Sequence, residues 1–321
     1  MKLLSFLFSL MVMSVDGFRV VTWYNGDLDG VSQIPFDKYT HIVVGSAKSF
    51  DNGTVTCDGS DKLTQAVVKA SKGTNTTIQW RYAGPDISKT LWNESNHYLV
   101  DNYFKSIGKA LNDCSVDGVE IDFEWGGTKW DLGFVPPEAA TTYTNFLANL
   151  KKVVGNDKIV SADIGVWGIP QGYIIGFLPW VNVTMLNNGV FDFVNTMSYH
   201  WNKDSSIWQW ELDHFMAGHV WEMDLSRVNL GLPYYSMNYS GFKIAGEPTW
   251  GSLSKTCPNI NPLINECDGI LFTGKKKNYD IGRYAVEKGF GGVFPWTLNY
   301  DSFENNNTLI DWLDCGIKSV I

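Results

Sequence analysis

The sequence predicts an α/β protein: a single-domain (β/α)8 TIM barrel with at most a short insertion after its seventh strand. Three observations predict this fold. Short segments rich in Val and Ile alternate with longer segments, several of which have helical periodicity. Eight such strands within about 300 residues suit a closed barrel better than an open sheet. The segment after the first strand, residues 24–30, lacks the G-x-G-x-x-G spacing that a doubly wound sheet needs there.

The predicted elements alternate along the whole chain. Apolar, β-branched segments predict strands at residues 19–23, 41–45, 77–82, 118–123, 159–164, 193–198, 228–232 and 291–294. An apolar face at helical spacing predicts helices at residues 62–71, 98–111, 136–154, 280–288 and 308–317. The segments after the first, fifth and sixth strands have no clear helical pattern. Between Tyr235 and Gly291 there is room for only a short loop and a helix, which predicts an open cleft.

The composition predicts a folded, acidic protein that is rich in aromatic residues. Hydrophobic residues make up 44% of the chain and charged residues 18%, which is enough apolar material for a sizeable core. Asp and Glu outnumber Lys and Arg by 34 to 25, and the net charge of −9 argues against a nucleic-acid partner. The 14 Trp residues have two interpretations, which are core filling and flat platforms for sugar rings.

Residues 1–17 are predicted to be a signal peptide, which leaves residues 18–321 as the barrel. Lys2 supplies a positive start, residues 3–15 are mainly apolar, and Val15 and Gly17 precede the expected cleavage site. The alternative is a buried N-terminal helix. This run is too short to span a bilayer and no later stretch is long enough, so we expect no membrane anchor. We expect a secreted or lumenal protein, either extracellular or in a lysosome- or vacuole-like compartment.

The sequons and cysteines agree with export. Six Asn residues lie in N-x-[ST] sequons and predict a glycoprotein: Asn52, Asn75, Asn93, Asn182, Asn238 and Asn306. Some of the five Cys residues are expected to pair in an oxidising compartment, and Cys257 and Cys267, which flank a short loop, are the best candidates. The odd number leaves at least one thiol free or paired between chains. No C-x-x-C spacing is present, and we expect neither a metal site nor a cofactor.

Three acidic residues on the fourth predicted strand are the strongest functional signal. Apolar Val119, Ile121 and Phe123 alternate with acidic Glu120, Asp122 and Glu124. If the apolar set packs against the helices, the acids face the lumen about 6.5 Å apart. Repulsion and burial are then expected to raise the pKa of at least one acid, so that a proton is held near neutral pH, as a general acid requires. The alternative is an edge strand with a solvated acidic face.

The same segment resembles the fourth-strand motif of glycoside hydrolase family 18, the chitinase-like family. The family pattern is roughly D-G-hydrophobic-[DN]-hydrophobic-D-x-E. Asp117, Gly118, Asp122 and Glu124 match it, whereas Glu120 stands where the family has Asp or Asn.

Three later segments extend the resemblance: residues 195–199, 231–235 and 291–296 resemble the family's sixth, seventh and last strands. Met197 and Tyr199 match the sixth-strand pattern, and His200 stands in place of its usual Asp. Residues 78–84 lack the usual S-x-G-G of the third strand. Arg81, in that segment, is expected to form an ion pair, with a sugar contact as the alternative.

The resemblance implies retaining, substrate-assisted hydrolysis. Glu124 then protonates the glycosidic oxygen, the substrate's N-acetyl oxygen attacks the anomeric carbon, and Asp122 accepts the acetamide N–H. Glu120 shares a proton with Asp122, and Tyr199 donates to the acetyl oxygen. Trp296 forms the floor of the sugar site, and the other expected substrate-binding residues are Met197, His200, Trp23 and Trp125. For both Trp23 and Trp125, packing within the barrel is the alternative.

The implied protein is a secreted, monomeric glycosidase acting on β-1,4-linked N-acetylglucosamine, in chitin or chitooligosaccharides. An endo-β-N-acetylglucosaminidase or chitobiase-like enzyme, acting on N-glycan cores, has the same chemistry and remains an alternative. The other alternative is a non-catalytic chitin-binding lectin. Glu120 and His200 mildly favour the lectin, whereas Asp122 and Glu124 favour an enzyme.

Overall fold

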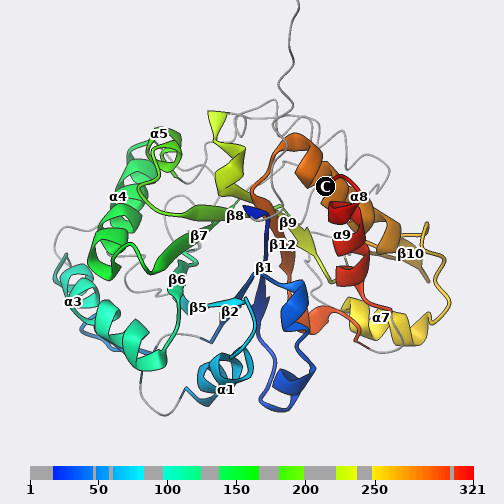
Figure 1. Ribbon diagram of the computed structural model, residues 1–321, viewed down its shortest axis with the longest axis horizontal. Coiled ribbons are helices and arrows are strands. Elements are labelled where there is room, and N and C mark those ends of the chain that lie inside the picture. Colours follow the sequence, from blue (N-terminus) through cyan, green and yellow to red (C-terminus); the bar gives the residue numbers. More distant parts are fainter. Residues whose placement is uncertain are drawn as a thin grey trace, which may run out of the picture.

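The protein folds into a closed barrel of eight parallel strands (Figure 1), as the sequence predicts. The computed structural model describes residues 17–45, 48–57, 61–82, 97–123, 137–165, 181–198, 222–236, 248–303 and 307–321. In barrel order the strands are β1 (Arg19–Tyr24), β2 (His41–Val44), β5 (Thr77–Tyr82), β6 (Gly118–Ile121), β7 (Ile159–Gly165), β8 (Phe193–Met197), β9 (Val228–Pro233) and β12 (Gly292–Trp296). Strand β12 pairs with β1 and closes the barrel.

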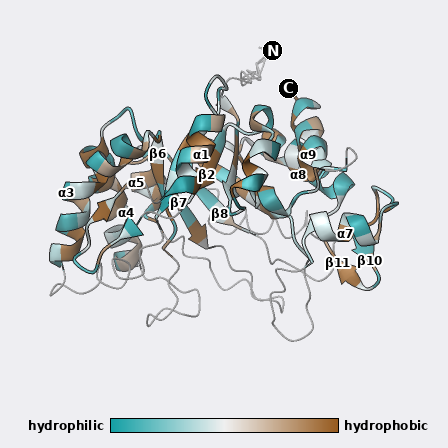
Figure 2. Ribbon diagram, turned by 90° about the horizontal axis from the view of Figure 1, so that it is seen from below, coloured by the Kyte–Doolittle hydropathy of each residue, from teal (hydrophilic) through white to brown (hydrophobic). Residues whose placement is uncertain are grey.

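Helices surround the barrel and turn apolar side chains towards it (Figures 1 and 2). They are α1 (Lys62–Ala70), α3 (His97–Cys114), α4 (Pro137–Val154), α5 (Val183–Asn187), α7 (Trp250–Thr256), α8 (Lys275–Lys288) and α9 (Leu309–Lys318). The five helices expected from periodicity correspond to α1, α3, α4, α8 and α9. In the part of the chain that the structure describes, no helix has the length and apolar character that crossing a membrane requires.

Shorter elements complete the connections. Short 3-10 turns lie at Asp29–Gln33, Phe36–Lys38, Leu225–Arg227 and Leu298–Tyr300. Two small hairpins pair β3 (Lys48–Ser49) with β4 (Val55–Thr56), and β10 (Glu266–Cys267) with β11 (Ile270–Leu271). Helix α7 and the second hairpin lie between β9 and α8, on the side of the barrel away from α3 and α4 (Figures 1 and 2).

Two disulfides stabilise these connections. Cys257–Cys267 joins the end of α7 to β10 and confirms the predicted pair. Cys57–Cys114 joins the segment after β4 to the last residue of α3, a pairing that the sequence spacing did not indicate. Cys315 on α9 is a free, exposed thiol.

Strand alternation separates two apolar cores. Val119, Ile121 and Phe123 face outwards and pack with helix residues such as Phe146 of α4, whose ring centroid lies 5.5 Å from that of Phe123. A smaller cluster fills one side of the lumen with Val21, Trp23, Val43, Phe193, Tyr235 and Phe294. The acidic positions of β6 therefore face the lumen, as their period-two spacing predicts.

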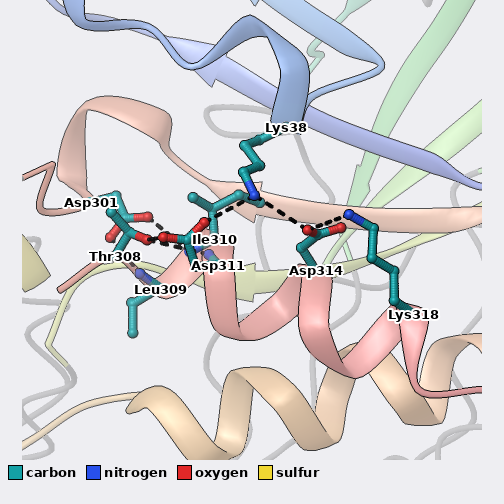
Figure 3. Close-up of polar contacts among 8 residues, drawn as sticks. All are labelled: Lys38, Asp301, Thr308, Leu309, Ile310, Asp311, Asp314 and Lys318. Carbon is teal, nitrogen blue, oxygen red and sulfur yellow. Dashed lines mark hydrogen bonds and ion pairs between the residues drawn. The ribbon is translucent and has the colours of Figure 1, made fainter. Parts of the chain in front are cut away.

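The last helix is attached to the barrel by a buried carboxylate (Figure 3). Asp301 follows the last strand, and its oxygens accept hydrogen bonds from the backbone N–H groups of Ser302 at 2.7 Å, Leu309 at 2.8 Å and Ile310 at 3.0 Å. Farther along α9, Asp311 and Asp314 lie 3.1 Å and 3.4 Å from the Nζ atom of Lys38. We call Asp301 and its three N–H donors the α9 clamp.

Candidate active site

Five neighbouring strands, β5 to β9, line one wall of the lumen with polar side chains. These residues are Gln79, Arg81, Glu120, Asp122, Ser161, Asp163, Asn195 and Asn229, and all except Arg81 are at most 4% exposed. Strand β6 is paired on both sides, with β5 and with β7. The alternative of a solvated edge strand is therefore excluded.

A relay of amides fixes the positions of two buried acids. The Nδ2 group of Asn195 donates to Oε1 of Glu120 at 2.6 Å and to Oδ1 of Asp163 at 3.0 Å. Its own Oδ1 accepts from Nδ2 of Asn229 at 2.8 Å, and Oδ1 of Asn229 accepts from Nε of Arg19 at 2.9 Å. Because the amide oxygen of Asn195 is occupied by the donor from Asn229, the nitrogen end of the amide faces the two acids, and each of its N–H bonds is directed at one of them.

The second feature is an ion pair beside two indole rings. Nη2 of Arg81 lies 2.8 Å from Oδ2 of Asp122, which confirms the ion pair expected for Arg81. The same guanidinium lies 4.2 Å from the ring centroid of Trp23. Trp23 in turn lies 4.2 Å from the ring of Trp296, with the ring planes tilted by 58°. Arg81 is thus held by a charge on one side and an aromatic face on the other.

The acids differ in how easily they ionise. Burial, reinforced by the charge of Asp122, raises the pKa of Glu120 to about 8. Burial raises the pKa of Asp163 well above its ordinary value, and the charges of Glu120 and Asp122 add to the effect. The pKa of Asp122 is raised by burial but lowered in part by Arg81. These shifts favour a bound proton on at least one acid near neutral pH, in the direction that the sequence predicts.

The structure describes five of the nine site residues expected from the sequence. Glu120 lies on β6 and Asp122 directly follows it. Met197 and Trp296 end β8 and β12 and are half-buried, whereas Trp23 on β1 is 1% exposed. Glu124, Trp125, Tyr199 and His200 lie outside the described residues.

Sequence reasoning missed Asp163, and it named Asn195 only as the start of a motif. The signal for Asp163 was available, because Ser161 and Asp163 alternate with Val160, Ala162 and Ile164 on β7. This is the same period-two pattern that located the acids on β6. Asn195 lies opposite Asp163 in the β7–β8 register, a pairing that only the assembled sheet reveals.

A closed barrel whose lumen holds neighbouring protonated and ion-paired acids defines an enzyme of the (β/α)8 class with an acid–base site. Comparison with protein families then narrows the class. The model of the glycosyl hydrolases family 18 matches residues 19–301, so the chain belongs to this family and is a glycoside hydrolase.

Several solved structures of low sequence identity have the same fold. The GH18 chitinase ChiB of Flavobacterium johnsoniae has a TM-score of 0.69 and 22% identity, with 94% of each chain covered. The second catalytic domain of Ostrinia furnacalis Group II chitinase, solved with a bound N-acetylchitooligosaccharide, has a TM-score of 0.68 and 14% identity, covering 94% of this chain and 97% of that one. A family 18 N-acetylglucosaminidase of Paenibacillus barengoltzii has a TM-score of 0.66 and 14% identity, covering 93% and 99%. A search of curated proteins found no match.

Proposed function

We propose that the protein is a secreted glycosidase that hydrolyses β-1,4-linked N-acetylglucosamine in chitin or chitooligosaccharides. The observation that carries this proposal is the Asp122 carboxyl, 4% exposed and held 2.8 Å from Arg81 beside the Trp23–Trp296 pair. Glu124 follows two residues later, in the position of the family's proton donor. In this proposal the protein acts as a monomer and needs no cofactor.

The proposed reaction is retaining and substrate-assisted. Glu124 gives its proton to the glycosidic oxygen as that oxygen leaves the anomeric carbon. The carbonyl oxygen of the substrate's own N-acetyl group forms the new bond to that carbon, which yields a cyclic oxazolinium ion. Water then attacks the same carbon, Glu124 takes one of its protons, and the ring reopens with the configuration retained.

Asp122 and Glu120 act on the acetamide side of this reaction. A carboxylate at Asp122 accepts the acetamide N–H and stabilises the positive charge of the oxazolinium ion. Arg81 holds that carboxylate in place, since their polar atoms are 2.8 Å apart. Tyr199 donates its hydroxyl to the acetyl oxygen.

The aromatic residues bind the sugar at the mouth of the barrel. Trp296 is half-buried at the end of β12 and offers its ring as the floor of the sugar site. Trp23 is almost fully buried between Trp296 and Arg81, so it contributes by supporting Trp296. Met197, Trp125 and His200 complete the proposed binding site.

Export is supported by the covalent features of the chain. Residues 1–17 are proposed as a removable signal peptide and residues 18–321 as the catalytic barrel. Two disulfides suit an oxidising compartment. Of the sequons, Asn52 and Asn75 are exposed, whereas the side chain of Asn182 caps α5 and donates to Thr141 at 3.1 Å. Asn52 and Asn75 are therefore better placed to carry glycans than Asn182.

The test is hydrolysis of a fluorogenic chitooligosaccharide from pH 4 to pH 8. The Glu124→Gln variant is expected to lose about 10²–10⁴-fold in kcat, the contribution typical of a general acid. Glu138→Gln, at an exposed acid of α4, is the matched control and should keep full activity.

Two other results would change the assignment. Binding of the oligosaccharide without release of fluorophore, by parent and variant alike, would replace the hydrolase with the lectin. Cleavage of a glycoprotein's N-glycan cores in place of chitooligosaccharides would move the substrate to the endo-β-N-acetylglucosaminidase class.

A further inference from the structure

Glu120 and Asp163 are two buried acids on neighbouring strands that each have one oxygen without a donor. Asn195 uses both of its N–H bonds on Oε1 of Glu120 and Oδ1 of Asp163. The other two oxygens, Oε2 and Oδ2, are buried and have no hydrogen-bond partner among the described residues. The two carboxyl groups lie beside each other, because the same amide nitrogen of Asn195 donates to both, at 2.6 Å and 3.0 Å. A proton shared between the two carboxyl groups supplies a donor that the described residues otherwise lack there.

The local charge leads to the same conclusion. The carboxyl groups of Glu120, Asp122 and Asp163 lie together in the lumen. Among the described residues, Arg81 is the cation that acts on them. Its contact is with Asp122, so no cation among the described residues is in contact with Glu120 or Asp163. Two like charges this close in a buried site cannot both ionise near neutral pH.

The extra methylene of Glu120 explains why this pair forms. Family 18 has Asp or Asn at this position, and the resemblance implied a proton shared between Glu120 and Asp122. In this structure Glu120 reaches across β7 to Asn195 of β8, where the amide donates at 2.6 Å. Its carboxyl is thereby placed beside Asp163, while Asp122 faces Arg81.

We propose that Asp163 is a positioning residue that shares a proton with Glu120, so that Asp122 remains a carboxylate paired with Arg81. The catalytic part of this inference rests on the proposed function, because it concerns the charge that Asp122 offers to the acetamide. The shared proton itself does not depend on the substrate.

Several other groups influence this pair. Asp122 is the other titratable group whose charge acts on it, and Arg81 is the cation. The three acids in turn act on Tyr143 of α4. Burial raises the pKa of Tyr143 well above its ordinary value, so this phenol stays neutral. The indole N–H of Trp23 lies near the Glu120 carboxyl and favours its ionised form, without reaching full hydrogen-bond geometry.

Proton linkage tests the pair without a substrate. Free carboxyl groups ionise near pH 4, so between pH 5 and pH 7 the native pair holds a proton that the unfolded chain has lost. Each such proton makes the unfolding equilibrium constant rise about tenfold per pH unit, so stability falls as the pH rises. In Asp163→Asn the amide still offers a donor to Glu120 and an acceptor to Asn195, but it has no proton that it gains or loses in this pH range. Urea unfolding measures the slope of the unfolding free energy against pH. In this variant the slope should correspond to at least one proton fewer than in the parent.

The matched control is Ser161→Ala, on the same strand and also fully buried. It removes the hydroxyl that accepts from Nε2 of Gln79 at 2.8 Å, and it should keep the parent's pH dependence. If Asp163→Asn also keeps the parent's pH dependence, Asp163 is ionised in the native protein and the proposal is wrong. Should Asp163→Asn not fold, Glu120→Gln removes the same proton from the other partner.

Kinetics test the positioning role. Asp163→Asn should lose the change in kcat at the pH where the pair releases its proton. Asp163→Ala should lower kcat up to about a hundredfold, with a much smaller change in KM. An unchanged kcat in folded Asp163→Ala would leave a structural role only and overturn the positioning role. An inactive parent would contradict the proposed function, and the unfolding experiment would still decide whether the proton is shared.

Discussion

The α9 clamp and the lumen acids are two buried carboxyl sites that the protein satisfies in different ways. Burial raises the pKa of Asp301 to about 7 and that of Glu120 to about 8. The Asp301 oxygens are occupied by the backbone N–H groups of Leu309 and Ile310 at the start of α9 (Figure 3) and by that of Ser302. Glu120 and Asp163 each keep an oxygen without a donor among the described residues. A carboxyl filled by backbone donors holds the fold together, whereas one with an open acceptor in the lumen is available for proton chemistry.

This contrast predicts separable effects. Substitutions in the clamp should change stability and leave catalysis unchanged, because Asp301 contacts α9 and not the lumen acids. Substitutions among the lumen acids should change catalysis first. If a substitution in the clamp lowers kcat of the folded protein, or a substitution of a lumen acid leaves kcat unchanged, the two sites do not differ in the way described.

Among substitutions of the described residues, the largest effect is expected for Asp122→Asn. This change removes the negative charge that faces Arg81 and stabilises the oxazolinium ion, so kcat should fall about 10²–10³-fold. The measurement is kcat on a chitooligosaccharide, with a thermal melt to show that the protein is folded.

The control is Asp192→Asn, directly before β8. Asp192 pairs with Lys151 at 2.9 Å and is partly exposed, so its loss should leave kcat unchanged. Equal losses for both variants would mean that any broken ion pair impairs the barrel, and the special role of Asp122 would have to be abandoned.

Asp301→Ala should have the largest effect on stability. It leaves the N–H groups of Ser302, Leu309 and Ile310 without their acceptor, and the expected loss is about 3 kcal/mol. Urea unfolding measures this loss, and kcat of the folded variant should equal that of the parent. Asp314→Ala, which removes only ion pairs on the surface of α9, should lose less than about 1 kcal/mol.

The pH dependence of stability separates the clamp from the lumen. The folded pKa of Asp301, about 7, lies above the ordinary value near 4. The stabilisation from its proton is therefore fully present below pH 4 and is lost as the pH rises from 4 through 7. Stability should fall with rising pH by about 1.4 kcal/mol per unit for this proton, and Asp301→Asn should remove that slope. Unfolding curves from pH 4 to pH 8 decide the point. A parent-like slope in Asp301→Asn would show that the three N–H groups keep Asp301 ionised.

Sequence alone predicted the parts of this molecule that depend on local pattern. The alternation of Val119, Ile121 and Phe123 with acidic residues was sufficient to assign the outer and lumen faces of β6, and the barrel followed from eight such strands. The first connection departs from a βα unit because Pro35 lies between two short turns, where a helix is disfavoured.

The rest depends on contacts between distant segments. The hydrogen bonds that join Glu120, Asp163 and Asn195 form only when β7 pairs with β6 on one side and β8 on the other, which spacing along one strand does not reveal. Cys57 and Cys114 are 57 residues apart, so no local pattern indicates their pairing. Two of the Asp301 donors, Leu309 and Ile310, lie eight and nine residues later, and nothing in the sequence distinguishes this Asp from an exposed one.

Glu120→Asp tests whether the lumen is built for the longer acid. The shorter side chain withdraws the carboxyl from Asn195, so we expect about a tenfold lower kcat, near 1.4 kcal/mol. The measurement compares kcat and the pH dependence of unfolding with the parent. A gain in activity would mean that Glu120 is a handicap and that the family-typical Asp serves this site better.

The smallest effect is expected for the ion pairs that Lys38 and Lys318 form with Asp311 and Asp314 of α9. Lys38 lies 3.1 Å from Asp311 and 3.4 Å from Asp314, and its side chain is 28% exposed (Figure 3). Lys38→Met keeps the apolar stem and should cost about 0.5–1 kcal/mol, a loss that shrinks in high salt. Lys318→Met, which removes a 68% exposed partner of Asp314, should cost less because solvent already screens that pair. Equal losses would place the stabilisation of α9 in its surface charges and not in the buried Asp301, and the distinction between the two carboxyl sites would weaken.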